Sequence, residues 1–252
     1  MNSPNSGSRN RLLHADRDLL THTLETVDLD VHQVLEAPNE PVSHAYFIES
    51  GIVSVVAAVP PDDRMEGGMI GYEGMTGLCI VLGEDRAANE TLVQSSGSAM
   101  RLSNKSLREM IDASRTLTLA LLRYVNVSMV QGSQTALDNG RGRLDERLAR
   151  WLLMWDDRIR PHDITVTHEI TVTHEFLALV LGVARPGLTH TMHQLEAKGL
   201  IRTTRSLIQV LNRDGLRLAA NGFYGVSEAE YDRIIGVEPW IPTVHRAAAT
   251  AQ

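Results

Sequence analysis

Apolar positions change their spacing once between residues 173 and 211, at residue 200. Two groups recur at three- and four-residue intervals, which is the period of a helix with one buried face. From residue 200 onward apolar and polar positions alternate instead, which indicates two short strands joined at residues 205–206. The pattern predicts two helices and then a β-hairpin, and the helical positions are Phe176, Leu177, Val180 and Leu181, followed by Leu188, Met192 and Leu195.

Residues with known positional preferences mark the ends of both helices. Thr173 is placed to cap the first helix with its hydroxyl, and Glu175 puts a negative charge in the first turn, where the helix dipole favours it. Gly182 can adopt positive φ, which suits an abrupt end. Pro186 falls in the first turn of the second helix, where a missing N–H costs nothing, and Gly199 ends that helix. We interpret the segment as a helix-turn-helix with a β-hairpin wing.

The first hundred residues follow a different pattern. Short extended segments alternate with turn residues, among them residues 38–41 and 49–51, and this density predicts an antiparallel barrel or jelly roll. The remaining elements are predicted from apolar stripes and breakers: helices over residues 16–26, 106–112, 114–137, 143–159, 214–220 and 224–235, with a break at residues 140–142.

The segment from Thr173 onward resembles the winged helix-turn-helix of the Crp/Fnr family of bacterial transcription regulators. Residues 34–56 are similar to the first half of that family's cyclic-nucleotide-binding-type β-roll, in which a glycine corresponding to Gly51 separates two strands. The resemblance covers roughly residues 17–235. The helix-turn-helix match consists of a threonine cap, an acidic helix start, a Leu-Gly-Val turn, an arginine and a Leu-Glu-x-x-Gly-Leu-Ile exit, here Thr173, Glu175, Leu181, Gly182, Val183, Arg185 and residues 195–201.

The resemblance implies an α+β fold with an amino-terminal, jelly-roll-like antiparallel β-roll, a long dimerisation helix and a carboxy-terminal winged helix-turn-helix. The implied segments are a sensor roll over residues 1–112, a dimerisation helix over 113–140, a DNA-binding domain over 141–235 and a tail over 236–252. In the family the long helix pairs with its copy in a homodimer. The apolar stripe of this helix consists of Leu121, Leu122, Val125 and Met129. The same stripe would equally fit a helix that packs on the roll of its own chain.

The same resemblance implies which residues contact double-stranded DNA. The second helix would present Arg185, Pro186, Thr189 and His190 to the major groove, and Arg185 can form a bidentate contact with guanine O6 and N7. Pro186 and His190 stand where well-studied relatives have glutamate and a second arginine, so the preferred operator should differ. Phosphate contacts, which set register without reading sequence, are expected from Thr173, His174, Arg202 and Arg205.

Residues 66–87 correspond to the region that holds the phosphate cassette of cyclic-nucleotide binders, and Glu73, Gly74 and Arg86 form a possible effector pocket. Glu73-Gly74 reverses the family's Gly-Glu order, however, and Arg86 is followed by Ala87 with no hydroxyl. Each lost charge-assisted hydrogen bond to a phosphate is worth roughly 1.5 to 3 kcal/mol. We therefore do not expect cyclic AMP to bind in the way that is usual for the family. The sequence identifies no cofactor. An alternative is a cyclic mono- or dinucleotide-binding module that signals through a protein partner.

Charge and composition limit which classes of function and location are possible for this protein. The net charge is −7, but residues 164–223 carry six basic and four acidic side chains, which is the one segment with a positive balance. This is where attraction to phosphate would require it. Cys79 is the single cysteine, which excludes an intramolecular disulfide and a Cys-only iron–sulfur site. With no signal-peptide pattern and no apolar stretch of about 18 residues, we expect a cytoplasmic protein that does not enter a membrane.

Residues 164–175 contain the tandem duplication ITVTHE-ITVTHE. Its first copy is predicted to be a strand. The repeated His-Glu pairs invite a metal-site interpretation, but His168 and His174 are six residues apart and no recognised ligand spacing is present. Because no nucleophile with a base and no phosphate loop is present either, the chain is not expected to be an enzyme. The resemblance instead implies a DNA-binding homodimer that acts with RNA polymerase.

Overall fold

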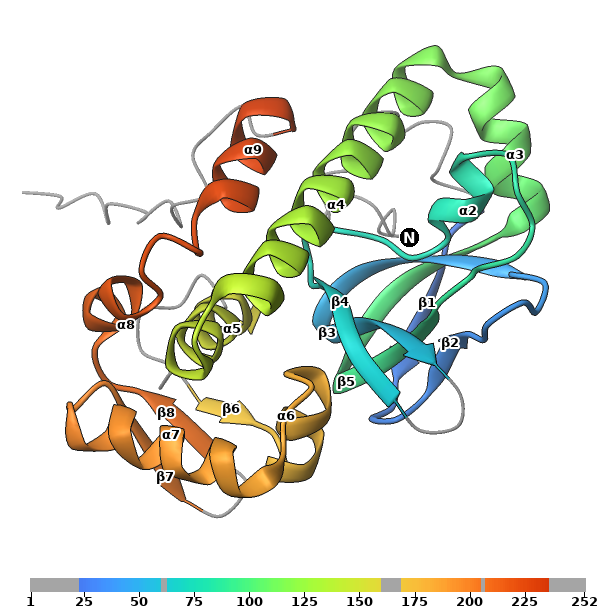
Figure 1. Cartoon of the computed structure of the whole chain (residues 1–252). Helices are drawn as coiled ribbons and strands as arrows, with labels where there is room; N and C mark the ends of the chain where they lie inside the picture. Colours follow the sequence, from blue (N-terminus) through green and yellow to red (C-terminus); the bar gives the residue numbers. More distant parts are fainter. Residues whose placement is uncertain (1–22, 60–62, 160–168, 205–206, 236–252) are drawn as a thin grey trace, which may run out of the picture.

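The computed structural model describes residues 23–59, 63–159, 169–204 and 207–235. Its larger sheet is five-stranded and antiparallel, in the order β1-β5-β3-β4, and β2 also pairs with β5 (Figure 1). This sheet curls into the predicted roll. The bounds of its strands are β1 Glu25–Leu29, β2 Val34–Glu36, β3 His44–Val59, β4 Asp63–Ile70 and β5 Glu90–Ser103.

A turn predicted at residues 49–51 is absent, because β3 runs through these residues as one strand with shifts of register against β5. Gly51 has φ of 86° at the irregular point, and a Cβ there would lie 2.6 Å from the carbonyl oxygen of Ser95. Across the pair, a Cβ at Gly97 would lie 2.0 Å from the oxygen of Ser50. The two glycines therefore let the long strands approach closely where the roll bends.

The roll is followed by helices with clear caps. They are α2 (Leu78–Val81), α3 (Asn104–Ala113), α4 (Arg115–Arg141) and α5 (Leu144–Ile159). The hydroxyls of Ser103 and Ser114 accept hydrogen bonds from Ser106 N and Leu117 N, both at 3.1 Å, and so start α3 and α4. Helix α4 continues through Gly140 and Arg141, where a break was predicted, and ends at Gly142.

The long helix α4 has two apolar faces. Leu121 and Val125 are buried against their own chain, whereas Leu122 is 42% exposed and Met129 is 67% exposed. The predicted stripe therefore divides, and the part of it that faces the roll cannot contact a partner. The exposed positions recur with alternating four- and three-residue spacing, which is the pattern of a helix-pairing seam, and they are Leu119, Leu122, Asn126, Met129, Ser133 and Ala136.

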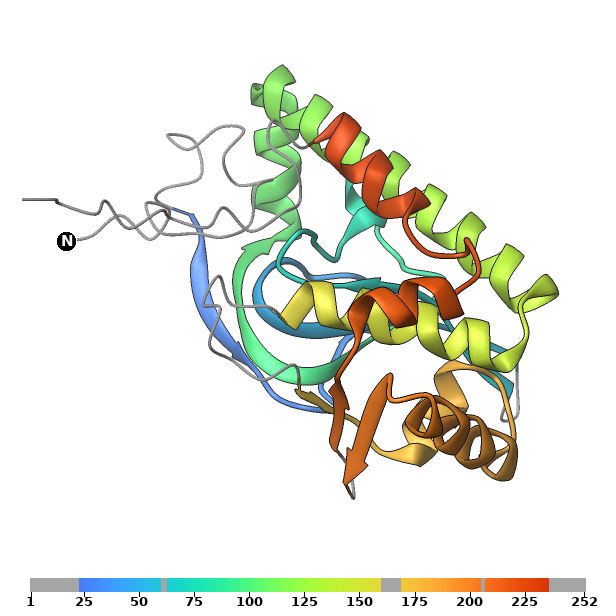
Figure 2. The ribbon, with the colours of Figure 1, turned by 90° about the vertical axis from the view of Figure 1, so that its left-hand side faces the viewer.

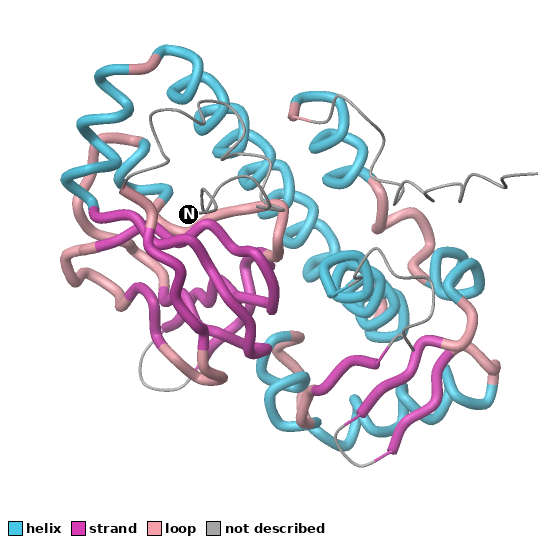
Figure 3. Tube along the Cα trace, turned by 180° about the vertical axis from the view of Figure 1, so that it is seen from behind, coloured by secondary structure: helices cyan, strands magenta, loops and turns pink. Residues whose placement is uncertain are grey.

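Beyond α5 the chain forms the winged helix-turn-helix. Figure 3 shows its strands as a second magenta group, separated from the roll by helices. The strand order is β6-β8-β7, so the wing has three strands where the sequence indicated two. The element bounds are β6 Glu169–Thr171, α6 His174–Val180, α7 Arg185–Ala197, β7 Ile201–Thr204, β8 Leu207–Val210 and α8 Arg213–Ala219.

The last helix, α9 (Val226–Ile234), returns to the roll side of the molecule. It packs along α4 although residues 142–225 separate the two helices in the chain, as Figure 2 shows. Tyr231 of α9 is buried in one apolar cluster with Tyr124 and Val127 of α4 and with Phe47 of the roll. The carboxy-terminal part of the chain is thereby attached to the roll and to α4.

The α+β class, the roll, the long helix and the winged helix-turn-helix agree with the prediction. Most of the predicted helix over residues 16–26 lies outside the described residues, and its last two residues belong to β1. The first copy of the duplication lies outside them except for Glu169, which begins β6, and so does the predicted tail. None of the described helices is long and apolar enough to cross a bilayer.

Replacing Gly51 by alanine should destabilise the roll. The left-handed backbone costs alanine about 1 to 2 kcal/mol, and the close Ser95 oxygen adds to this. Gly67→Ala is the matched control, because its Cβ would meet only the Val55 oxygen at 3.7 Å. Urea unfolding should give a lower free energy of unfolding for Gly51→Ala alone, and equal values for the two variants would contradict this interpretation of the bulge.

Candidate DNA-reading interface

Local hydrogen bonds build the helix-turn-helix as its sequence indicated. The Thr173 hydroxyl accepts from Phe176 N at 3.1 Å and caps α6. Gly182 has φ of 59° at the turn, and Val183 N donates to Ala178 O at 2.9 Å. Pro186 lies in the first turn of α7. These contacts fix the angle between α6 and α7 without any partner.

Helix α7 separates a buried face from an exposed one. Leu188, Met192 and Leu195 are buried in the core of the domain. Arg185, Pro186 and His190 are exposed on the other face, and Thr189 is partly exposed. The structure therefore brings the four predicted groove-reading residues to one accessible edge of the domain.

Arg185 has a partner that the sequence did not reveal. Its Nη1 lies 2.5 Å from Oε1 of Glu175 in the first turn of α6, and both side chains are largely exposed. An exposed ion pair is worth at most about 1 kcal/mol, whereas a bidentate contact with guanine is worth about 1 to 3 kcal/mol. A guanine edge can therefore displace Glu175. Opposite charges in the first turns of two consecutive helices are the sequence signal from which this pair could have been predicted.

The wing and the helix start contribute the predicted phosphate-contacting residues. Thr173 and Arg202 are exposed, and His174 is partly exposed. Arg205 lies outside the described residues. Glu196 of α7 accepts from Thr203 N at 2.6 Å and from the Thr203 hydroxyl at 2.5 Å, which lowers the pKa of Glu196 and holds β7 against the helix.

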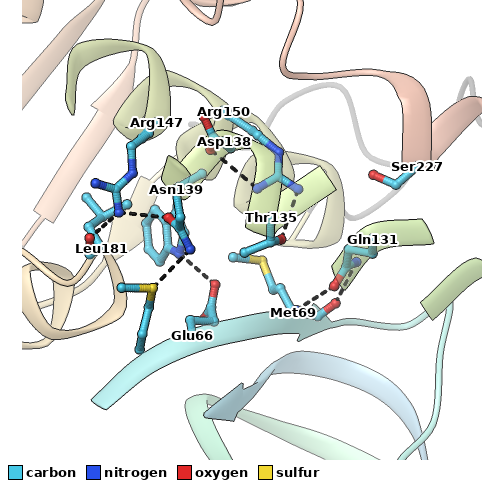
Figure 4. Close-up of polar contacts among 12 residues, drawn as sticks. Glu66, Met69, Gln131, Thr135, Asp138, Asn139, Arg147, Arg150, Leu181 and Ser227 are labelled. Atoms are coloured by element: carbon cyan, nitrogen blue, oxygen red, sulfur yellow. Dashed lines mark hydrogen bonds and ion pairs between the residues drawn. The ribbon is translucent and has the colours of Figure 1, made fainter. Parts of the chain in front are cut away.

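The turn of the helix-turn-helix is docked on the roll. A Cβ at Gly182 would lie 2.5 Å from Cε of Met65 in β4, so the turn and the strand are in contact. Arg147 of α5 donates to the Leu181 carbonyl and, at 2.7 Å, to Oδ1 of Asn139 (Figure 4). The Asn139 amide in turn lies 3.0 Å from the Met65 sulfur. The winged helix-turn-helix is thus fixed against the roll at its turn.

Helix α5 also contributes polar side chains to the contact between the winged helix-turn-helix and the roll. Trp151 Nε1 donates to Glu66 Oε1 at 3.0 Å, and the Ser54 hydroxyl lies 2.5 Å from Glu66 Oε2. Burial raises the pKa of Glu66 to about 7, and the two hydrogen bonds partly oppose this effect. At the other end of α5, Arg158 Nε donates to Glu73 Oε1 at 2.7 Å, with both side chains buried. None of these contacts could be read from sequence spacing.

Glu73, Gly74 and Arg86, the possible effector pocket, are not assembled as one. Glu73 is ion-paired with Arg158. A Cβ at Gly74 would lie 1.9 Å from the Tyr124 hydroxyl oxygen, so this glycine permits close packing of α4. Arg86 is exposed and its guanidinium donates to the Asn39 carbonyl oxygen at 2.5 Å. The three residues therefore do not converge on one site in this structure.

No three His, Cys, Asp or Glu side chains gather as a metal site requires, as far as the described residues extend. His168 of the duplicated pair lies outside them.

Comparison with known proteins defines the class. Residues 146–219 match the family model of the Crp-like helix-turn-helix domain. The matched domain belongs to transcription regulators rather than to enzymes. A comparison of the sequence with curated proteins gave no match.

Solved structures of Crp/Fnr regulators share the fold over most of this chain. FixK2 from Bradyrhizobium japonicum is 16% identical with a TM-score of 0.66, over 78% of this chain and 96% of that one. A Crp/Fnr-family regulator from Thermus thermophilus is 21% identical with a TM-score of 0.63, over 79% and 99%. The c-di-GMP responsive regulator CLP of Xanthomonas campestris is 17% identical with a TM-score of 0.62, over 78% and 98%. The chain therefore carries a Crp-like DNA-binding domain within the fold of the Crp/Fnr regulators.

Glu66→Gln should change how stability depends on pH. The folded protein holds the Glu66 proton more tightly than the unfolded chain, because burial raises the pKa from an ordinary 4.5 to about 7. This group therefore adds stability as the pH falls from 7 toward 4.5, by roughly 3 kcal/mol at most, and the gain is lost above pH 7. Urea unfolding at pH 5 and pH 8 measures the difference in the free energy of unfolding between the two pH values. This difference should be smaller in Glu66→Gln, because the variant has no carboxyl group to titrate.

The control for that experiment is Glu109→Gln on the exposed surface of α3, which removes a charge without touching the interface. An identical pH dependence in the wild type and in Glu66→Gln would show that Glu66 does not hold a proton at the contact with Trp151.

Proposed function

We propose that the chain is a sequence-specific transcription regulator that binds double-stranded DNA as a homodimer. The observation that carries the proposal is the exposed edge of α7, where Arg185, Pro186, Thr189 and His190 lie on a domain that matches the Crp-like model. The first turns of a recognition helix are where side chains reach base edges in the major groove. The cytoplasm and RNA polymerase are the corresponding location and protein partner in this proposal.

Roles within the interface follow from chemistry. Arg185 supplies two donors to one guanine in each half-site. Thr173, His174, Arg202 and Arg205 contact phosphate and set the register. Pro186 offers no hydrogen bond and His190 makes fewer than arginine, so base pairs beside that guanine are read less strictly. A dimer would place two α7 helices about 34 Å apart, which requires half-sites one helical turn apart.

The dimer would form along the exposed seam of α4. Leu119, Leu122 and Met129 are large apolar side chains that the chain leaves uncovered. Ser133 and Ala136 continue the seam with small side chains, which permit close helix approach. Burying one Leu side chain contributes roughly 1.5 to 3 kcal/mol, and each seam residue is buried twice in a symmetric pair.

Selection of bound sequences from random duplex DNA tests the assignment of reading roles. The wild type should enrich a near-palindrome, and Arg185→Ala should lose preference at one symmetric pair of positions, with a cost of about 1 to 3 kcal/mol per half-site. Arg202→Ala is the contrast, because loss of a phosphate contact should weaken binding to all sequences and reduce the salt dependence. Unchanged base preferences in Arg185→Ala would contradict the role of this residue.

Leu122→Arg should convert the dimer to a monomer at micromolar concentration, because a charge would replace an apolar side chain at the centre of the seam. Leu218→Arg is the control, since Leu218 is 83% exposed on α8, far along the chain from the seam. Sedimentation velocity measures both variants. A wild-type protein that sediments as a monomer, alone and with DNA, would refute the proposed dimer.

A further inference from the structure

The ion pair between Glu175 and Arg185 engages only one nitrogen of the guanidinium group. Oε1 of Glu175 lies 2.5 Å from Nη1 of Arg185. In a guanidinium group, the Nη2 and Nε atoms form a second edge with two parallel N–H donors. Between described residues, no hydrogen bond or ion pair occupies this second edge of Arg185. Arg185 can therefore contact Glu175 and a second planar acceptor at the same time.

Guanine presents a planar pair of acceptors that matches this edge. Its O6 and N7 atoms face the major groove and accept two N–H groups from one arginine. The Nη2 and Nε atoms of Arg185 supply these two donors while Nη1 stays with Glu175. The ion pair is thus compatible with base reading, although the guanine contact is also strong enough to replace it.

The backbone holds both residues in fixed positions. Glu175 lies in the first turn of α6, and Arg185 is the first residue of α7. The turn between them is closed by the hydrogen bond from Val183 N to Ala178 O at 2.9 Å. A flexible side chain loses rotamer freedom when it binds, and a contact that already exists in the free protein reduces that loss. Glu175 therefore prepares Arg185 for binding from the neighbouring helix.

No residue of α7 can replace Glu175 as the partner of Arg185. Glu196 is the one acidic residue of α7, and it accepts hydrogen bonds from the main chain and the hydroxyl of Thr203. It also lies about 16 Å from Arg185 along the helix axis. The carboxylate that contacts Arg185 therefore has to come from α6.

Phosphate oxygens compete with guanine for the same edge of Arg185. Arginine binds phosphate and planar base edges through the same paired donors. A phosphate group carries a full negative charge, whereas the guanine edge is neutral. The carboxylate of Glu175, held against the guanidinium, therefore repels phosphate at the second edge but does not repel guanine in this way. The ion pair favours contact with the base over contact with the DNA backbone.

We propose that Glu175 is a specificity-determining residue that positions Arg185 for guanine and disfavours contact of Arg185 with phosphate. Glu175 acts through Arg185 and does not itself have to touch a base. The first helix of the helix-turn-helix thereby takes part in base discrimination, beyond the favourable charge that Glu175 places at the start of α6. This inference rests on the proposed function, in which Arg185 reads guanine.

Binding of two duplexes to the full-length protein tests the inference. One is the near-palindrome that the wild type enriches, and the other has A·T in place of the two G·C pairs whose preference Arg185→Ala loses. Glu175→Ala should reduce the ratio of the two dissociation constants by about threefold per half-site, which is the size of effect that an exposed ion pair gives. Glu175→Gln should give an intermediate ratio, because its amide oxygen can accept from Nη1 without the negative charge. Fluorescence anisotropy measures both constants.

The salt dependence of binding provides a second readout. In Glu175→Ala the released guanidinium should contact phosphate on the substituted duplex. The slope of the logarithm of the binding constant against the logarithm of the salt concentration should then steepen by about 0.9 per protomer. A purely structural role of Glu175 would instead weaken binding to both duplexes equally and leave their ratio unchanged.

Asp214→Ala is the matched control. Asp214 is exposed and is the second residue of α8, as Glu175 is the second residue of α6. It forms no ion pair with any described residue. Its replacement should leave the ratio of the dissociation constants unchanged. In the Arg185→Ala background, Glu175→Ala should also leave this ratio unchanged, because the residue through which Glu175 acts is absent.

The inference is overturned if Glu175→Ala keeps the wild-type ratio, if Asp214→Ala lowers the ratio equally, or if the double variant differs from Arg185→Ala. Each of these results leaves the proposed function intact, since the wild type still selects its near-palindrome. A wild type that enriches no sequence would instead refute the proposed function and the inference together.

Discussion

The structure depends on the partners that the buried polar side chains of helix α5 find in the roll. Residues 148–158 are buried between the roll and the winged domain, and they include Trp151 and Arg158, each with a polar group to satisfy. The roll supplies Glu66 for one and Glu73 for the other. Removing one partner of a buried ion pair typically costs about 3 to 5 kcal/mol, so the pair of Arg158 with Glu73 strongly disfavours other placements of α5 against the roll. The outer face of α7 stays accessible because the contact uses the turn and α5 instead.

The helix-turn-helix could be predicted from sequence because its signals are local. Thr173, Gly182 and Pro186 act through conformational preferences within one or two turns of where they stand. The docking of this domain could not be predicted, since Glu66 and Trp151 are 85 positions apart and their pairing depends on the closed roll. The ion pair of Arg185 with Glu175 lies between these cases, because the turn brings two nearby segments together.

Gly51 and Glu73 show where a correct residue was given the wrong context. Gly51 was interpreted as a turn between strands, but positive φ serves equally in a bulge, and only the pairing of β3 with β5 distinguishes them. Glu73 was placed near a phosphate cassette by resemblance, whereas in the structure its carboxylate forms a buried ion pair with Arg158. In both cases the residue could be recognised in the sequence, but its role depended on which residues it contacts in the fold.

Several contacts that fix the helices in place end on main-chain atoms. Arg147 donates to the Leu181 carbonyl, Gln131 pairs with both backbone groups of Met69, and Tyr231 donates to the Glu73 carbonyl. A main-chain acceptor is supplied by any residue type, so in each case only the reaching side chain is constrained. Each of these contacts can therefore persist when the residue that supplies the main-chain atom is replaced by another type over evolutionary time.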